Sequence, residues 1–137
     1  MLLWLAATMA DPAPACAGMT LPAAVADYAT RIQAMDVDRI GALFAPDGVA
    51  EAGGKTLTGA AENAEFLKAY AAYRVTSEAI TIETLSPAPG GWAVAARFHQ
   101  TGLTPDAKPY DAQGRLQITW RCLSGEWRIA RLATLPN

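Results

Sequence analysis

The fold of this chain is decided by residues 21–59, which read LPAAVADYATRIQAMDVDRIGALFAPDGVAEAGGKTLTG. Apolar side chains recur every three or four residues in the first part of the stretch, a spacing typical of one face of a helix. They are Leu21, Val25, Tyr28, Ile32 and Met35. We expect a helix that carries the hydroxyl of Tyr28 on the face that must pack against a sheet.

The same stretch predicts a second, shorter helix and a hairpin. Asp36 suits a helix N-cap, and Val37, Ile40 and Phe44 form an apolar stripe after it. We expect this second helix to end where residues 46–48 read Pro-Asp-Gly. Residues 53–54 are both glycine and lie between two short runs, which is typical of a hairpin turn.

A third helix is expected over residues 60–72, which are rich in Ala, Leu, Lys and Glu. Phe66, Tyr70 and Tyr73 fall on one face of it. This aromatic stripe is either part of the core or one wall of a ligand pocket, and the spacing alone is compatible with both.

The second half of the chain changes to the texture of strands. Expected strands cover residues 75–85, 92–101, 115–123 and 126–135. Helices that precede a run of strands are typical of the α+β class. We therefore predict a cone-shaped barrel in which three N-terminal helices pack over a curved mixed, mostly antiparallel sheet.

Composition limits the classes of partner. Of the 137 residues, 52% are hydrophobic and 18% are charged, and the formal net charge is −2. One globular domain with no basic patch is expected, so we predict no nucleic-acid partner. Cys16, Cys122 and His99 do not have the spacing of metal ligands, and we expect no metal and no cofactor. Cys122 is interpreted as a small buried hydrophobic residue.

The N-terminus permits two interpretations. Residues 2–10 are apolar, and Ala15-Cys16-Ala17 has the small-x-small pattern of a secretory leader cut before Gly18. However, no Lys or Arg precedes the apolar run, and the run is too short to span a bilayer. We therefore divide the chain into an extension or signal peptide (1–20) and a domain (21–137). No membrane insertion is predicted, and the location is cytoplasmic, or periplasmic or secreted if residues 1–17 act as a signal peptide.

The order of elements and several phrases resemble the SnoaL-like branch of the nuclear transport factor 2-like superfamily. These phrases are Leu21-Pro22-Ala23-Ala24 leading to Tyr28, DVDRIGALF at 36–44, APDGV at 45–49, Thr58-Gly59, and GEWRIARL at 125–132. The resemblance covers residues 21–135 and implies the cone fold with an apolar pocket. This fold hosts isomerases, cyclases, dehydratases, epoxide hydrolases and modules without activity, so function must be argued from the site. Like the namesake transport factor, the chain is expected to form a homodimer through its sheet.

Ketosteroid isomerase is the nearest enzyme for comparison. Tyr28 matches, by its position in the pattern, the tyrosine that supplies that enzyme's oxyanion hole. The catalytic base of the isomerase would fall at or next to Ala52, and its second acid near Gln117. Neither residue is a carboxylic acid, and therefore steroid isomerase activity is not expected.

Candidate site residues follow from the resemblance and from residue chemistry. A buried phenol can stabilise an oxyanion and needs a base as its partner, so the catalytic candidates are Tyr28, His99 and Glu51. Either face of the strand that carries His99 can line the cone. The expected pocket consists of Tyr28, Ile32, Phe44, Phe66, Tyr70, Phe98, Gln117 and Thr119.

Three functions are compatible with this sequence. The first is a SnoaL-like domain that binds a small apolar molecule. The second is a cofactor-free acid–base isomerase, hydratase or cyclase with an apolar polycyclic substrate. The third is a dimerisation module without activity.

Overall fold

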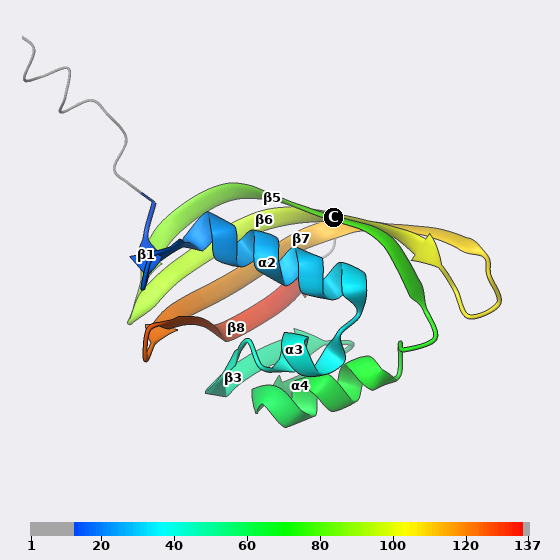
Figure 1. Ribbon diagram of the computed structural model, residues 1–137, viewed down its shortest axis with the longest axis horizontal. Helices are drawn as coiled ribbons and strands as arrows, with labels where there is room; N and C mark the ends of the chain where they lie inside the picture. Colours follow the sequence, from blue (N-terminus) through cyan, green and yellow to red (C-terminus); the bar gives the residue numbers. More distant parts are fainter. Residues whose placement is uncertain (1–12, 136–137) are drawn as a thin grey trace, which may run out of the picture.

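Three helices pack on a curved sheet in the computed structural model, which describes residues 13–135 (Figure 1). The helices are α2 (Leu21–Ala34), α3 (Val37–Gly41) and α4 (Gly59–Lys68). The main sheet contains β3 (Phe44–Ala52), β4 (Lys55–Thr58), β5 (Arg74–Ala88), β6 (Gly91–Leu103), β7 (Pro109–Leu123) and β8 (Glu126–Leu135). A small sheet of β1 (Ala15–Cys16) and β2 (Met19–Thr20) precedes them.

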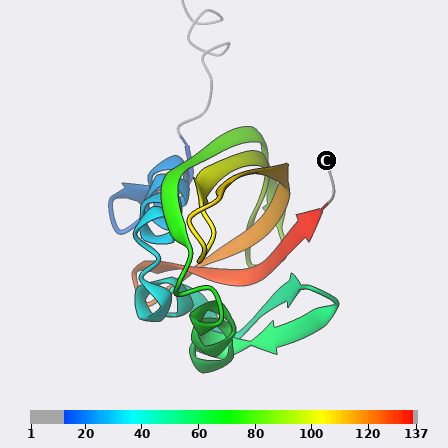
Figure 2. The ribbon, with the colours of Figure 1, turned by 90° about the vertical axis from the view of Figure 1, so that its right-hand side faces the viewer.

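The strand order of the main sheet is β4-β3-β8-β7-β6-β5. All neighbours are antiparallel except β3 and β8, which run parallel. The sheet curls around α2 but its edge strands β4 and β5 do not pair, so it does not close as a barrel (Figure 2). This arrangement confirms the predicted α+β class with a mixed, mostly antiparallel sheet.

Helix α2 follows the sequence prediction closely. The Thr20 side chain caps its N-terminus by accepting a hydrogen bond from the backbone N–H of Ala23, 3.2 Å away. Met35 ends the helix in the left-handed conformation, with φ of 50°. The predicted stripe lies against the sheet, where Leu21 is fully buried and Tyr28 is 8% exposed.

The prediction for the second helix is wrong at its C-terminal end. Helix α3 ends at Gly41, and Phe44, expected on its last turn, instead begins strand β3. The backbone explains the difference: Ile129 N–H donates to the carbonyl of Leu43, and Phe44 pairs with Ile129 of β8. Pairing with a strand that lies far away in sequence overrides the local helical spacing.

Helix α4 is also shorter than expected. It ends at Lys68, and the backbone then continues in tight turns that place Tyr70 and Tyr73 outside the helix. Each of these turns is closed by a bond to the carbonyl three residues back, for example from Tyr73 N–H to Tyr70. The two tyrosines therefore project from a turn that ends beside the sheet and not from a regular helical stripe.

Residues 15–20 form a hairpin that is tied to the domain. Cys16 and Cys122 form a disulfide and Cys122 is exposed, so the interpretation of Cys122 as a small buried hydrophobic residue is wrong. The indole N–H of Trp127 donates to the carbonyl of Met19 at 2.8 Å, and Leu21 N–H donates to Pro14 at 2.7 Å. The apolar run at 2–10 lies outside the described residues, and a cut before Gly18, one of the two interpretations of the N-terminus, would fall inside this hairpin.

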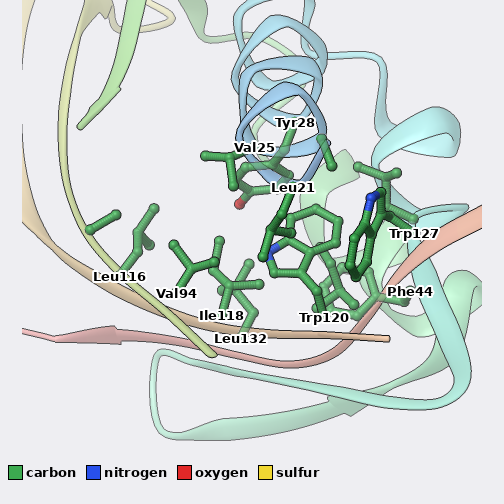
Figure 3. Packing of buried hydrophobic residues seen from close by; sticks show 14 of the residues in the cluster. Leu21, Val25, Tyr28, Phe44, Val94, Leu116, Ile118, Trp120, Trp127 and Leu132 are labelled. Carbon is green, nitrogen blue, oxygen red and sulfur yellow. The ribbon is translucent and has the colours of Figure 1, made fainter. Parts of the chain in front are cut away.

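The core lies between α2 and the concave face of the sheet (Figure 3). Its most buried members come from neighbouring strands and include Val94, Ile118, Trp120 and Ile129, each at most 1% exposed. Within residues 13–135, no helix is long and apolar enough to cross a membrane.

Candidate functional site

A cleft lies between α2 and the concave face of the sheet, beside the core. It consists of two adjoining hollows that share Ile32 and Gln100. The Tyr28 hollow, of about 200 Å³, is lined by Tyr28, Ile32, Glu78, Phe98, Gln100, Leu116 and Thr134. The tyrosine hollow, of about 240 Å³, is lined by Ile32, Met35, Leu67, Tyr70, Tyr73, Gln100 and Tyr110. The two hollows together are called the cleft below.

Tyr28 enters the cleft from the middle of α2. Its hydroxyl oxygen lies on the side of the helix that faces the sheet (Figure 3). None of the side-chain hydrogen bonds among residues 13–135 involves this hydroxyl, although the residue is 8% exposed. Burial, and then the nearby Glu78 carboxylate, raise the pKa of Tyr28 well above its ordinary value. The phenol therefore stays protonated and can donate a hydrogen bond to a ligand.

Glu78 is the only carboxylate among the residues that line the cleft. It lies on β5 directly opposite Gln100 of β6, whose amide donates to the Glu78 carboxylate at 2.8 Å. The hydroxyl of Tyr110 in turn donates to the amide oxygen of Gln100 at 2.9 Å. These three side chains form a chain of hydrogen bonds from one hollow to the other.

The electrostatics of this chain follow from its partial burial. Burial raises the pKa of Glu78, while the Gln100 hydrogen bond and the charge of His99 act in the opposite direction. Burial also raises the pKa of Tyr110. The site thus combines two neutral phenols with one carboxylate whose charge is incompletely solvated.

Two glycines on neighbouring strands let aromatic rings lie flat against the sheet. A Cβ on Gly114 would meet the ring of Phe98 at 2.7 Å, and a Cβ on Gly102 would meet the ring and hydroxyl of Tyr110 at 2.7 Å. Phe98 is paired with Gly114, and Tyr110 with Gly102, across the β6–β7 ladder. The glycines therefore leave room for the two rings beside the cleft.

The aromatic stripe predicted from sequence forms part of the cleft wall. Ring centroids are 5.7 Å apart for Phe66 and Tyr70, 5.5 Å for Tyr70 and Tyr73, and 6.0 Å for Tyr73 and Tyr110. Tyr70 is 41% exposed. Of the two interpretations, the geometry favours the wall of a pocket for Tyr70 and Tyr73, while the Phe66 ring lies against Tyr70 without lining either hollow.

The structure brings four of the predicted site residues to the cleft and places the others elsewhere. Tyr28, Ile32, Tyr70 and Phe98 line it. Phe44 is buried in the core (6% exposed), where it packs near Trp127 (Figure 3). Gln117 and Thr119 lie on the outer face of the sheet, beside Ala93 and Ala95. Their strand alternates, and its inward positions are occupied by Leu116, Ile118 and Trp120.

Neither predicted partner base reaches Tyr28. His99 lies on the outer face, half exposed, with its Nε2 3.0 Å from the Asp111 carboxylate. The hydrogen bond to His99 lowers the pKa of Asp111. Glu51 is exposed on β3 and accepts a hydrogen bond from Arg131 at 2.5 Å. The alternation of β6, which the sequence left open, thus directs Phe98 and Gln100 inward and His99 outward.

Sequence reasoning missed Glu78, Gln100 and Tyr110. A signal was present for Glu78, since it shares the strand face of Ile80 and Ile82, which an alternating strand buries. For Tyr110 there is no local signal, because it lies between the expected strands 92–101 and 115–123, in a part of β7 that the sequence does not predict as strand. For Gln100 a signal is present in strand alternation. It follows Phe98, a predicted pocket residue, by two positions and therefore shares its face of β6.

A third hollow, of about 220 Å³, lies beside the β1–β2 hairpin and contains Arg31 and Trp127. Its charged groups are paired within the protein, since Arg31 lies 2.9 Å from Asp27 and Arg128 pairs with Glu126. Among residues 13–135, no group of three His, Cys, Asp or Glu side chains is placed to hold a metal ion. The cleft is therefore the stronger candidate for the functional site.

Comparisons with known proteins agree with this architecture. A family model for SnoaL-like domains matches residues 25–130. A ketosteroid isomerase-like protein from Erwinia carotovora atroseptica is 21% identical, with a TM-score of 0.72 over 83% of this chain and 91% of its own. A protein of unknown function from Mycobacterium tuberculosis is 21% identical, with a TM-score of 0.74 over 85% of this chain and 69% of its own.

The protein Aln2 from Streptomyces is 15% identical, with a TM-score of 0.69 over 85% of this chain and 87% of its own. No curated protein sequence matches the chain. Identities this low show a shared fold, whereas the family model spans most of the domain. Together with the cone of helices and sheet, the match establishes that this chain belongs to the family of SnoaL-like domains, a small-molecule binding fold.

Proposed function

We propose that the protein binds a small, mainly apolar molecule in the cleft. The observation that carries the proposal is the Tyr28 hydroxyl, which has no hydrogen-bond partner among the described residues although it lies on the wall of a cleft. A phenol hydroxyl on the wall of a cleft can donate a hydrogen bond, and a bound molecule would supply the acceptor here. The apolar and aromatic lining of both hollows supports the same ligand class.

A thermal-shift screen of the protein against steroids, polyketides, terpenoids and small acids tests this function. We expect a ligand of the cleft to raise the melting temperature by several degrees. For such a ligand, Tyr28→Phe should weaken binding by about three- to tenfold, the loss of one hydrogen bond, while the melting temperature of the free protein changes little.

Gln117→Ala, on the outer face, is the matched control and should leave binding unchanged. A large loss of stability in Tyr28→Phe with unchanged affinity would mean that the tyrosine is a core residue. A folded, monodisperse sample that responds to no compound would contradict the proposed function.

Proton-transfer catalysis is a second candidate function. The observation that favours it is Glu78, a carboxylate with a raised pKa that shares the Tyr28 hollow. In this scheme Glu78 removes a proton from carbon, and Tyr28 donates a hydrogen bond to the oxygen that gains negative charge. Each ligand from the screen is incubated with the protein in D₂O, and exchange of its C–H groups is followed by NMR. Exchange that persists in Glu78→Gln would exclude Glu78 as the base.

Homodimerisation through the outer face of the sheet is a further proposal. Ala93 and Ala95 lie there in a shallow hollow with Gln117 and Thr119, and small side chains allow another surface to approach closely. Light scattering after size-exclusion chromatography should give twice the mass of one chain, and Ala95→Arg should reduce it to a monomer. A wild-type monomer at working concentration would contradict this proposal.

We also propose that the protein works in an oxidising compartment, the periplasm or the cell exterior. The Cys16–Cys122 disulfide supports this, because such bonds persist mainly outside the cytosol. A leader cut before Gly18 would detach Cys16, so the cut is proposed at a bond before Cys16. Expression of the chain in a bacterium, fractionation and intact-mass measurement test both points. A cytosolic, fully reduced product, or a mature chain that starts at Gly18, would contradict them.

A further inference from the structure

Within residues 13–135, the residues that line the cleft carry one negative charge and no positive charge. Glu78 is the one charged side chain among the described residues that line either hollow, and no Lys, Arg or His is among them. The other lining side chains are apolar, aromatic or neutral and polar. The cleft therefore presents negative charge to whatever enters it.

Glu78 has no cation paired with it in the described part of the chain. Its one side-chain partner there is the neutral amide of Gln100, at 2.8 Å. The outward residues of the same sheet do form ion pairs, such as Glu83 with Arg97 at 2.9 Å. A partly buried carboxylate without a counter-ion is costly, and the cost falls when a cation binds.

The tyrosine hollow supplies a second feature that suits a cation. Tyr70, Tyr73 and Tyr110 line it, and their successive ring centroids are 5.5 and 6.0 Å apart. The electron-rich faces of aromatic rings attract ammonium groups within about 6 Å. Gln100 touches both features, since its amide nitrogen bonds Glu78 and its amide oxygen accepts from Tyr110 at 2.9 Å. The carboxylate and the tyrosines are thus separated by the width of one amide group.

We propose that the cleft binds a cationic amine, whose ammonium group lies between the Glu78 carboxylate and the tyrosine rings. The apolar body of the amine lies against Ile32, Met35 and Leu67. Tyr28 donates to a polar atom further along the ligand. This inference rests on the binding function proposed above and adds the charge of the ligand, with Glu78 as the residue that determines specificity.

Three probes on one skeleton test the proposal: naphthylmethylamine, naphthylmethanol and naphthoic acid of the same ring isomer. Their affinities for the full-length protein are measured by calorimetry at neutral pH. The amine should bind at least about tenfold more tightly than the alcohol, since hydrogen bonds between charged groups are roughly twice as strong as neutral ones. The acid should bind more weakly than the alcohol, because it adds a second negative charge beside Glu78.

Glu78→Gln keeps the shape and the hydrogen bond with Gln100 while it removes the charge. In this variant the amine and the alcohol should bind with equal affinity, and retained binding of the alcohol shows that the cleft is intact. Glu83→Gln, on the outer face of the same strand, is the matched control and should keep the preference for the amine.

The outcomes distinguish an error in the charge of the ligand from an error in the binding function of the cleft. If the wild-type protein binds the alcohol as tightly as the amine, the cationic ligand is wrong while the binding function stands. If the preference survives Glu78→Gln, the assignment to Glu78 is wrong. If none of the three probes binds to the folded protein, the inference is overturned, whereas the binding function falls only if the thermal-shift screen gives no ligand either.

Discussion

At the scale of single residues, Glu78 is the one charged side chain in a cleft whose other described lining residues are neutral. It lies on an edge strand, yet its side chain turns into an apolar cleft toward Gln100 and not out to solvent. Its desolvation must make folding depend on pH, because the folded protein favours the protonated form of this group more than the unfolded chain does.

The sign of this pH dependence can be worked out. The folded pKa of Glu78 lies above its ordinary value of 4.5, so its contribution to stability is greatest below 4.5 and falls as pH rises through the folded pKa. Glu78→Gln removes this contribution. We therefore expect the variant to melt higher than the wild type at about pH 8, with a gap that narrows toward about pH 5. Paired melting curves across this range measure the gap, and a gap that stays constant would contradict the burial of the charge.

The residues of the cleft differ in how far sequence could predict them. Tyr28 and Ile32 can be predicted from the sequence, because helical spacing places both on the apolar face of the first helix. Phe98 was assigned to the pocket although the inward face of its strand was unknown. Glu78 was not found, since an acidic residue in an exposed edge strand is usually solvated. Alternation places Glu78 on the strand face of Ile80 and Ile82, but the position of that face beside Gln100 on the wall of the cleft follows only from the fold.

At the scale of elements, the fit between β6 and β7 determines the shape of the cleft. Phe98 and Tyr110 lie over glycines of the neighbouring strand, and each ring occupies the space of the missing Cβ. A methyl group at Gly114 must push the Phe98 ring into the cleft or push the strands apart. At Gly102 it would also meet the backbone carbonyl of Arg74 on the neighbouring strand β5.

Gly114→Ala tests this fit. We expect a loss of stability of about 1–3 kcal/mol, typical of overpacking, because the new Cβ would meet Phe98 at 2.7 Å and the carbonyl of Leu135 at 3.1 Å. Urea denaturation measures the loss. Adding Phe98→Leu to the variant should restore part of it. A stability equal to that of the wild type would show that the sheet accommodates the methyl group without strain.

Sequence predicted elements well where the signal was local. The turns Gly53-Gly54 and Ser124-Gly125 all have positive φ, as expected for two-residue hairpin turns. The end of α3 was predicted wrongly because Phe44 continues the helical spacing of Val37 and Ile40 in the sequence but pairs with Ile129 of β8 in the fold. The strand is formed because β8 supplies hydrogen bonds that no local pattern reveals.

At the scale of the whole molecule, the disulfide joins the N-terminal hairpin to the last hairpin of the domain, β7–β8. It closes a span of 106 residues between the N-terminal hairpin and β7. A cross-link over a long span restricts the unfolded chain more than a short one does. The bond therefore contributes to the stability of the entire domain as well as to the position of residues 15–20.

Cys16→Ser and Cys122→Ser should each destabilise the protein by about 2–4 kcal/mol. Denaturation of each variant beside the oxidised wild type measures the loss. A reductant should lower the melting temperature of the wild type and leave both variants unchanged, which separates loss of the bond from loss of a thiol contact. If the melting temperature of the wild type does not change with reductant although its thiols become reactive, the disulfide does not contribute to stability.

The parallel pairing of β3 with β8 has a consequence for biosynthesis. Val49, Ala50 and Glu51 pair on one side with the nearby β4. On the other side their partners are Arg131, Leu132 and Ala133, near the end of the domain. During translation the first half of the domain, with α2, α3 and the β3–β4 hairpin, emerges from the ribosome while the strand that must join it is not yet made. Until then the apolar faces of its helices have no sheet against which to pack. Such a nascent chain is suited to a chaperone that holds it unfolded, which is also the state in which a chain is threaded across a membrane.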